Sequence, residues 1–318
     1  MNELFISIII PTKNSSMIIE NCLNSIMHQN YKNFELIVVD GHSTDNTVEI
    51  ARKYTDKVYY ETSGTRASAC NVGVNHAKGD IIVFTDDDCE VPKDWLMQIA
   101  ANFNNEPIDV LGGSAITPEQ SSKIEKAFGA VLNHLLLFTY SWDSCEKVIG
   151  CNSAYKKQDL IEIGGFNEKL PTAEETELNF RLKKLGKKIK YSEKLSLLHN
   201  RRGTIRLFCK QQFKFGIGKG KWLRSNPSAI KASNIIVQLL IFGTFVILPI
   251  LVVFNLTIAS IILLTGFGLL LTSAFYASIK EKQVSIFPFI ILATIIWIYA
   301  QGFGQLSGLL QKEPQKNL

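Results

Sequence analysis

The sequence predicts an α/β domain, built on a mostly parallel sheet with helices on both faces, followed by C-terminal transmembrane helices. Two observations support this fold class. The first hundred residues alternate short apolar runs with helix-like stretches, and strands that are apolar throughout belong in sheets covered on both faces. The C-terminal third contains two long stretches, 233–279 and 284–311, without one Asp, Glu, Lys or Arg.

The predicted sheet begins with four strand-like runs, each ending in a polar segment. The runs are LFISIII before Pro11, NFELIVVD up to Asp40, KVYY at 57–60 and DIIVFTD into Asp86, and helix-like stretches accompany them at 15–28, 45–53, 66–77 and 92–104. Right-handed crossovers bring the carboxyl ends of parallel strands to one edge of a sheet. The polar segments 11–14, 40–45 and 86–88 are therefore expected to converge at the edge where α/β folds bind ligands.

Beyond residue 105 the alternation is weaker. VLGGSAIT is a further predicted strand, and 121–140, 157–163 and 174–186 are predicted helices. The second half of the first helix, AVLNHLLLFTY, is strongly apolar, which core packing explains and a face toward lipid also explains. The last helix begins from Thr172 or Ala173 and has acids in its first turn and lysines at its end, as the helix dipole favours.

The charge-free stretches predict transmembrane helices near 234–254, 256–279 and 286–310, since a span needs about 20 apolar residues. A pair of buried core helices is the alternative. Nine basic residues and no acid lie between 201 and 232, next to the first span. Lys280 and Lys282, two crossings later, fall on the same side. The positive-inside rule then places the N-terminal domain in the cytoplasm, with the chain a multi-pass protein of the cell membrane.

The chain is thus expected to have four parts: a catalytic domain at 1–200, a basic membrane-surface segment at 201–232, a transmembrane region at 233–311 and a short polar tail at 312–318. The N-terminus, with Glu3 and a strand ending at Pro11, is not that of a signal peptide. Six cysteines are scattered without CxxC spacing, so we expect reduced thiols.

Asp86, Asp87 and Asp88 follow a buried strand directly, although adjacent carboxylates repel one another. Capping of the helix near Pro92 would need only one of them. A Mg²⁺ or Mn²⁺ ion accounts for the cluster better, because both ions take carboxylate and phosphate oxygens. In a strand-like backbone Asp86 and Asp88 would share a face while Asp87 points away.

Two further polar groups suit a nucleotide. Asp40 ends a strand and is followed by Gly41 and a polar turn, so its carboxylate could accept from a base or a ribose hydroxyl. Arg66 opens the next helix and offers a planar donor for a pyrophosphate. An ordinary capped loop and a solvated surface charge are the respective alternatives.

The ordered motifs resemble family 2 glycosyltransferases of the GT-A fold over residues 4–220. The motifs are SIIIPTKN, LIVVDGHSTDNT, TRASACNVGVNHAKGDIIVFTDDDCEVPKDWL, GGFNEKL, AEETELNFRLKKLG and RRGTIRLFCKQQFKFG. The resemblance implies a UDP- or GDP-linked sugar donor, a Mg²⁺ or Mn²⁺ cofactor and inversion at the anomeric carbon. It implies nucleotide-sugar contacts for Pro11, Thr12, Asn14, Asp40, Arg66, Asp86 and Asp87, with metal ligation by Asp88 and Asp86. His199 matches a downstream metal-binding His of some relatives, and a purely structural His is the alternative.

An inverting transfer also needs a base for the acceptor hydroxyl. The resemblance assigns it to PTAEETEL, where the family usually has Glu-Asp with the Asp as base. That position is Glu175 here, one methylene longer, and Glu174 could share the role. Acids that merely complement a helix N-terminus are the alternative.

The segment QQFKFG (211–216) is a weakened form of the Gln-rich motif of processive members, with Lys214–Phe215 in place of Arg-Trp. Basic and aromatic residues interleave there as in an interfacial helix. We therefore expect transfer of one sugar to a lipid-linked acceptor, such as a polyprenyl or dolichyl phosphate or a lipid-linked glycan. The alternatives are a processive polysaccharide synthase and an inactive nucleotide-sugar-binding scaffold. Membrane lipids are expected partners and nucleic acid is not.

Overall fold

The computed structural model describes residues 3–135, 148–201 and 203–311, and it divides the chain into two compact units. The first comprises Met1–Pro118 and Trp142–Asn200, and the second comprises Glu119–Ser141 and Arg201–Leu318. The end of the helix expected at 121–140 and the tail expected at 312–318 lie outside the described residues.

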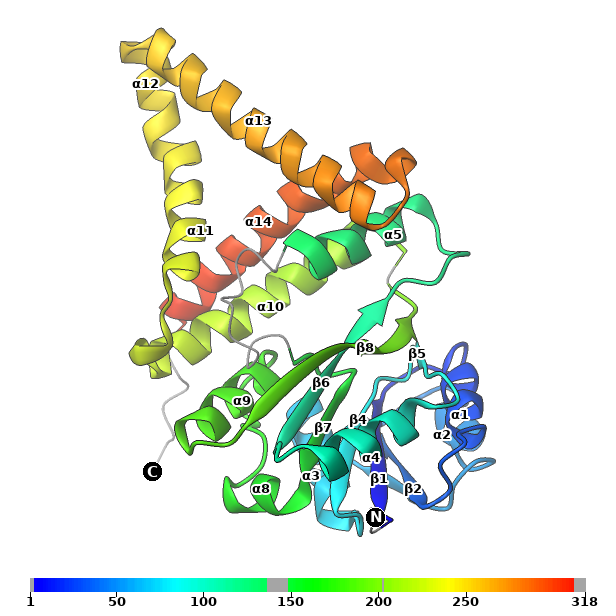
Figure 1. Ribbon diagram of the computed structural model, residues 1–318. Helices are drawn as coiled ribbons and strands as arrows, with labels where there is room; N and C mark the ends of the chain where they lie inside the picture. Colours follow the sequence, from blue (N-terminus) through cyan, green and yellow to red (C-terminus); the bar gives the residue numbers. More distant parts are fainter. Residues whose placement is uncertain (1–2, 136–147, 202, 312–318) are drawn as a thin grey trace. The chain divides into compact units, whose positions relative to one another are not determined.

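The first unit contains an eight-stranded sheet in the order β3-β2-β1-β4-β7-β6-β8-β5 (Figure 1). The strands are β1 (Ile6–Thr12), β2 (Phe34–Asp40), β3 (Val58–Tyr60), β4 (Ile81–Phe84), β5 (Cys89–Glu90), β6 (Val110–Ile116), β7 (Ser153–Lys156) and β8 (Ile189–His199). As predicted, β3, β2, β1 and β4 are parallel. The other half is mixed, because β7 runs antiparallel to β4 and β6, and β5 runs antiparallel to β8.

Helices cover both faces of this sheet, as the uniformly apolar strands predict. Alternate β1 residues separate the two cores: Ile8 packs with the helices α1, α2 and α4, whereas Ile9 packs with α3, α8 and α9. The helices are α1 (Ile19–Met27), α2 (Thr47–Ala51), α3 (Arg66–His76), α4 (Trp95–Asn105), α8 (Lys157–Glu162) and α9 (Glu174–Lys184).

Two local expectations need correction. Pro11 lies inside β1, paired with Val39, because the strand continues to Thr12 instead of ending at the proline. The Asp triplet is a turn between β4 and β5, not a strand-like segment, and the Cys89 N–H donates to the Asp86 carbonyl across it.

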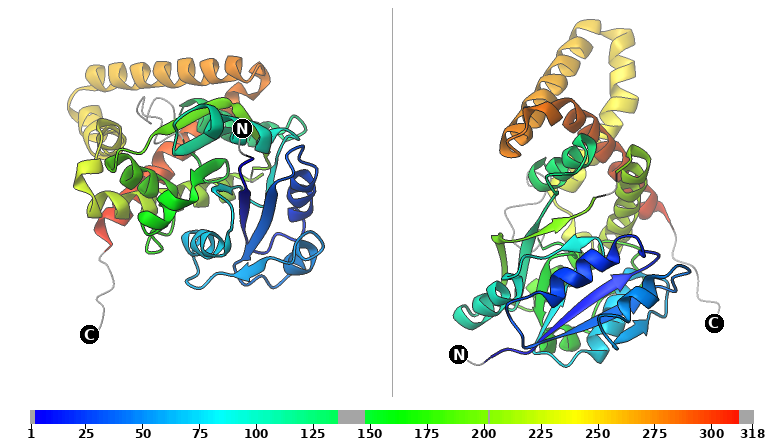
Figure 2. Two further views of the ribbon diagram at one scale, coloured as in Figure 1. Left: turned by 60° about the horizontal axis from the view of Figure 1, so that its bottom comes forward. Right: turned by 90° about the vertical axis from the view of Figure 1, so that its right-hand side faces the viewer.

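The second unit contains the long apolar helices. Its elements are α5 (Lys123–Ala130), a π-helical turn at Val131–Leu135, α10 (Ile205–Ser225), α11 (Ala232–Phe242), α12 (Leu248–Phe254), α13 (Leu256–Lys280) and α14 (Phe287–Leu310). Within the described residues, three stretches are long and apolar enough to cross a membrane: Asn234–Phe254, Leu256–Lys280 and Val284–Leu310. By length and composition these coincide with the three stretches predicted as spans, and Figure 2 shows the first two joined at one end by a turn.

The helices α10 and α14 lie side by side in close backbone contact (Figure 1). A Cβ on Gly216 would come 2.2 Å from the Gln301 carbonyl oxygen, and one on Gly304 would come 2.2 Å from the Phe213 carbonyl oxygen. Gly216 and Gly220 in α10 and Gly304 and Gly308 in α14 form a stripe of small residues along the contact, and such a stripe allows two helix backbones to approach closely. The stripe therefore defines how these two helices pack.

Candidate active site

The loops after β1 and β2 are tied together at the carboxyl edge of the sheet. Asp40 is fully buried, and its carboxylate accepts from the Ser43 N–H at 2.8 Å. The Asn14 N–H donates to the Ser43 hydroxyl, and the Asn14 side chain accepts from the Thr44 N–H, both at 2.8 Å. The two polar segments predicted to converge therefore form one hydrogen-bonded surface.

Left-handed backbone conformations occur in the same region. Asn14, His42 and Ala173 have φ values of 52°, 59° and 66°. A residue with a Cβ adopts this conformation at a cost of about 1–2 kcal/mol, so the surrounding contacts must impose it. Ala173 directly precedes the acids that begin α9.

Asp87 points into the loop after β1. Its carboxylate accepts from the hydroxyls of Thr12 and Ser15, each at 2.6 Å. Burial raises the pKa of Asp87 to about 6, although both hydrogen bonds act in the opposite direction. The central residue of the triplet thus fastens the turn to β1.

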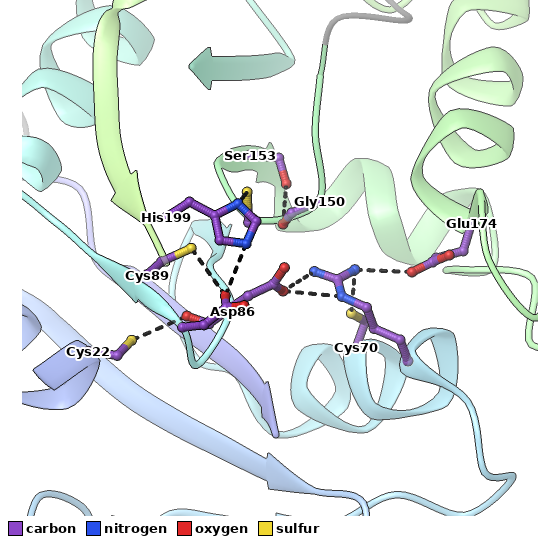
Figure 3. A network of polar contacts seen from close by, with 11 residues as sticks. Cys22, Cys70, Asp86, Cys89, Gly150, Ser153, Glu174 and His199 are labelled. Atoms are coloured by element: carbon purple, nitrogen blue, oxygen red, sulfur yellow. Dashed lines mark hydrogen bonds and ion pairs between the residues drawn. The ribbon is translucent and has the colours of Figure 1, made fainter. Parts of the chain in front are cut away.

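Asp86 is linked to α9 through Arg66. The guanidinium of Arg66 donates to Asp86 Oδ1 from Nη2 at 2.7 Å and from Nε at 3.2 Å, and to Glu174 Oε1 from Nη1 at 3.2 Å (Figure 3). Glu174 is buried, whereas the Asp86 and Arg66 side chains are partly exposed. One cation therefore joins residues that are 20 and 108 positions away in the chain.

Glu175 follows Glu174 in the first turn of α9 and is partly buried. Burial, and then the neighbouring charge of Glu174, raise the pKa of Glu175 to about 8, against the opposing charge of Arg66. The ionised form of such a carboxyl group is a stronger base than an ordinary carboxylate, and it predominates only above about pH 8. Further along, α9 is held by a hydrogen bond from the buried Tyr155 hydroxyl to Asn179 at 3.1 Å.

Asp88 faces His199 at the end of β8. The His199 Nε2 atom lies 3.3 Å from Asp88 Oδ1, and the Asn200 N–H donates to the Asp88 carbonyl at 2.9 Å. Burial opposes ionisation of Asp88, but the hydrogen bond and charge of His199 outweigh it and lower the pKa of Asp88. His199, which the sequence suggested as a partner of the Asp triplet, therefore lies in contact with the last residue of the triplet.

Two cysteines that the sequence motifs did not indicate also lie at this point. Cys89 and Cys151 are buried, and their sulfur atoms and a ring nitrogen of His199 lie within 4.8 Å of one another. The position of Cys89 directly after the Asp triplet was a signal that it lies at this edge. Nothing in the sequence pattern indicated that Cys151 lies beside it.

Of the eleven predicted site residues, nine have side chains at the carboxyl edge of the sheet or the turn beside it: Thr12, Asn14, Asp40, Arg66, Asp86, Asp87, Asp88, Glu174 and His199. Pro11 lies within β1, next to Thr12. Glu175 follows Glu174 directly. The acids offer oxygen ligands and His199 adds a nitrogen, a donor set that fits Mn²⁺ or Mg²⁺.

Known proteins resemble the chain over most of its length. The family model described as Glycosyl transferase family 2 matches residues 7–164. Glycosyltransferase AglE of Haloferax volcanii is 27% identical over 228 residues, which are 68% of this chain and 73% of that protein. A dolichyl N-acetyl-α-D-glucosaminyl phosphate 3-β-D-2,3-diacetamido-2,3-dideoxy-β-D-glucuronosyltransferase of Methanococcus voltae is 25% identical over 238 residues, covering 69% of this chain and 74% of that protein.

Among solved structures, the mannosyltransferase PcManGT from Pyrobaculum calidifontis, in complex with GDP-Man and Mn²⁺, aligns with a TM-score of 0.66 at 18% identity. The alignment covers 94% of this chain and 88% of PcManGT. At this identity the likeness establishes the fold, which is GT-A followed by apolar C-terminal helices. The family match, with the two relatives, shows that this chain belongs to glycosyl transferase family 2.

Proposed function

We propose that this glycosyltransferase moves one hexose-type sugar, with inversion, from a UDP- or GDP-linked donor to a lipid-linked acceptor at the membrane surface. The observation that carries the proposal is the Arg66 bridge between Asp86 and Glu174. It joins the proposed nucleotide and metal residues to the acids of α9. Donor binding and proton removal can therefore occur side by side.

The nucleotide would lie on the joined loops after β1 and β2. Thr12 and Asn14 lie in this region, Asp40 is positioned by Ser43, and Arg66 offers a cation for the diphosphate. The binding of GDP-Man by the PcManGT structure supports a nucleotide-linked donor.

A Mg²⁺ or Mn²⁺ ion would be held by Asp88 and Asp86, with His199 as a nitrogen ligand. When bound, the ion supplies positive charge against the leaving diphosphate. The Mn²⁺ in the PcManGT complex supports a divalent cofactor. His199 favours Mn²⁺ over Mg²⁺, because imidazole is a softer ligand than a carboxylate.

Glu175 would act as the general base. It accepts the proton of the acceptor hydroxyl as that oxygen bonds to the anomeric carbon, and the bond from that carbon to the diphosphate breaks on the opposite face. Glu174, engaged by Arg66, would position Arg66 and keep the pKa of Glu175 high. The longer Glu side chain, in place of the usual Asp, would reach an acceptor that lies further from α9.

The proposed acceptor follows from the membrane unit. Three apolar helices are long enough to span a bilayer, and the preceding α10 carries basic residues with exposed Leu207, Phe213 and Phe215. The basic side chains favour an anionic surface, which supports a cytoplasmic orientation. The name of the Methanococcus voltae relative includes a dolichyl-phosphate-linked sugar, which supports a polyprenyl-type acceptor.

A donor panel tests this function. Detergent-purified protein is incubated with UDP- and GDP-sugars and a polyprenyl-phosphate extract, with and without Mn²⁺ or Mg²⁺, and release of nucleoside diphosphate is measured. The proposal expects one metal-dependent donor, with turnover lost in Asp88→Ala and Glu175→Gln. Asp56→Asn removes an exposed carboxylate before β3, away from the carboxyl edge, and should retain activity.

Other outcomes identify the alternatives. Several sugars on each acceptor would indicate a processive synthase. Donor binding without turnover, whatever lipid fraction is added, would indicate a nucleotide-sugar-binding scaffold. Salt-sensitive nucleic-acid binding through 201–231, without membrane retention, would overturn the membrane reading.

A further inference from the structure

Beside the proposed nucleotide site is a cluster with different chemistry. The Sγ atoms of Cys89 and Cys151 and a nitrogen of His199 lie within 4.8 Å of one another, and both cysteines are buried. Among the described residues this is the one such group of three metal-ligating side chains. Two thiols and an imidazole select Zn²⁺-class ions, not the hard Mg²⁺ that carboxylates prefer.

The cluster is held in place by backbone structure on each side. Cys89 in β5 and His199 in β8 are directly opposite each other in an antiparallel pair. The neighbour of Cys151, Asn152, is fully buried and donates to the carbonyls of Ser114 and Leu195 at 2.8 and 2.9 Å. Three separate chain segments are therefore fixed around one point.

The imidazole of His199 already has the orientation of a metal ligand. Nδ1 lies 3.9 Å from Cys151 Sγ, while Nε2 lies 3.3 Å from Asp88 Oδ1 (Figure 3). Histidines that bind zinc commonly donate their other ring N–H to a carboxylate, which fixes the tautomer. Asp88 is that carboxylate here, so an imidazole that loses its Nδ1 proton on metal binding would keep the Nε2 proton toward Asp88 and present Nδ1 to the ion beside the two sulfur atoms.

The spacing also suits a bound ion. With Zn–S near 2.3 Å and Zn–N near 2.0–2.1 Å, tetrahedral ligand atoms lie about 3.4–3.8 Å apart. The observed separations of up to 4.8 Å would contract by roughly one ångström on binding. His199 and Asp88 are 18% and 23% exposed, which offers an entry path to the otherwise buried sulfur atoms.

We propose that Cys89, Cys151 and His199 form a second metal site that binds a zinc-class ion and antagonises the Mg²⁺ or Mn²⁺ ion at Asp88. Binding releases two protons from the three ligands to solvent and leaves a fourth position open. His199 then holds Asp88 through Nε2–H, so neither residue is free for the other cation. Binding itself is independent of the proposed function, but the inhibitory effect rests on it.

Cadmium titration tests binding directly. The full-length protein in detergent carries Cys145→Ser and Cys209→Ser, since Cys209 is exposed and Cys145 lies outside the described residues. One equivalent of Cd²⁺ should produce thiolate-to-cadmium ultraviolet absorption that Zn²⁺ abolishes by competition. Adding Cys89→Ser or Cys151→Ser should remove most of it, whereas adding Cys22→Ser, at a buried thiol outside the cluster, should not.

Two measurements guard against misfolding and separate the claims. His199→Gln leaves both thiols but should weaken Cd²⁺ binding by at least about tenfold. Zn²⁺ should inhibit Mn²⁺-dependent turnover in the parent and less in Cys151→Ser, each relative to its own uninhibited rate. No absorption in the parent, or absorption that survives in both cysteine variants, would overturn the site. Cadmium binding without zinc inhibition would retain the site and reject the antagonism.

Discussion

The pH dependence of sugar transfer provides a sharp prediction about Glu175. A general base works in its ionised form, and the ionised form of Glu175 is lost as pH falls through a pKa of about 8. Below that pH, kcat/KM should fall about tenfold per pH unit, from about one-tenth ionised at pH 7 to about one-hundredth at pH 6. An ordinary Glu, with a pKa near 4.3, would produce no change in this range.

The charged residues around Glu175 indicate which substitution should change its pKa. Glu174 raises its pKa from the same helix, Asp86 raises it from the turn after β4, and Arg66 lowers it from α3. Burial is the largest cause. Glu174→Gln removes one negative charge near Glu175 but leaves Glu175 buried. The acidic limb of the kcat/KM profile should therefore move to lower pH, but its apparent pKa should stay above that of a solvated Glu.

The assay is nucleoside diphosphate release at low donor concentration, between about pH 5.5 and 9, because kcat/KM reports the free enzyme. The Asp56→Asn variant, with its exposed carboxylate removed, should retain the wild-type limb. A flat profile for the wild type would refute Glu175 as the base with a raised pKa. A limb that moves to higher pH in Glu174→Gln would refute the electrostatic explanation.

Three further substitutions follow from the geometry. Gly216→Ala should lower the melting temperature in detergent by an amount equivalent to about 1–3 kcal/mol, because its Cβ would meet the Gln301 carbonyl oxygen at 2.2 Å. The control Gly268→Ala places its Cβ in open space and should leave the melting temperature unchanged. Equal effects of the two substitutions would argue against close packing of α10 and α14. Ala173→Gly should raise the free energy of unfolding by up to about 1–2 kcal/mol by removing left-handed strain, and chemical denaturation that shows a loss would contradict this. Arg66→Lys should raise the donor KM about tenfold, because an ammonium cannot reproduce the fork of hydrogen bonds to two carboxylates, and an unchanged KM would remove Arg66 from donor binding.

The parallel half of the sheet was readable from the sequence because its strands are apolar on both faces. The strand β8 could not be predicted in this way, since IKYSEKLSLLH is mostly half-exposed and contains four charged or basic side chains, including His199. It is a strand because it pairs with β6 and β5. Local pattern carries no information about such pairing.

In the candidate site, too, some positions could be predicted from the local sequence and others depend on tertiary packing. Strand ends alone predicted that Asp40 and the Asp triplet would lie on one edge, because crossover geometry is general. The contact of Arg66 with Glu174 spans 108 positions and depends on how α9 packs, which no motif spacing reveals. Cys151 was read as an ordinary thiol, because its approach to His199 depends on the buried hydrogen bonds of Asn152.

Transfer of labelled sugar into lipid by the wild type and by Glu175→Gln tests the central claim most directly. Membrane-lipid extract, Mn²⁺ and the turned-over donor are mixed with each protein, and the label is followed in the solvent-extracted lipid while donor binding is measured separately. We predict labelled lipid from the wild type, and from Glu175→Gln intact donor binding with no labelled lipid. Labelled lipid at the wild-type rate from Glu175→Gln, or label only in water-soluble product from the wild type, would contradict the account.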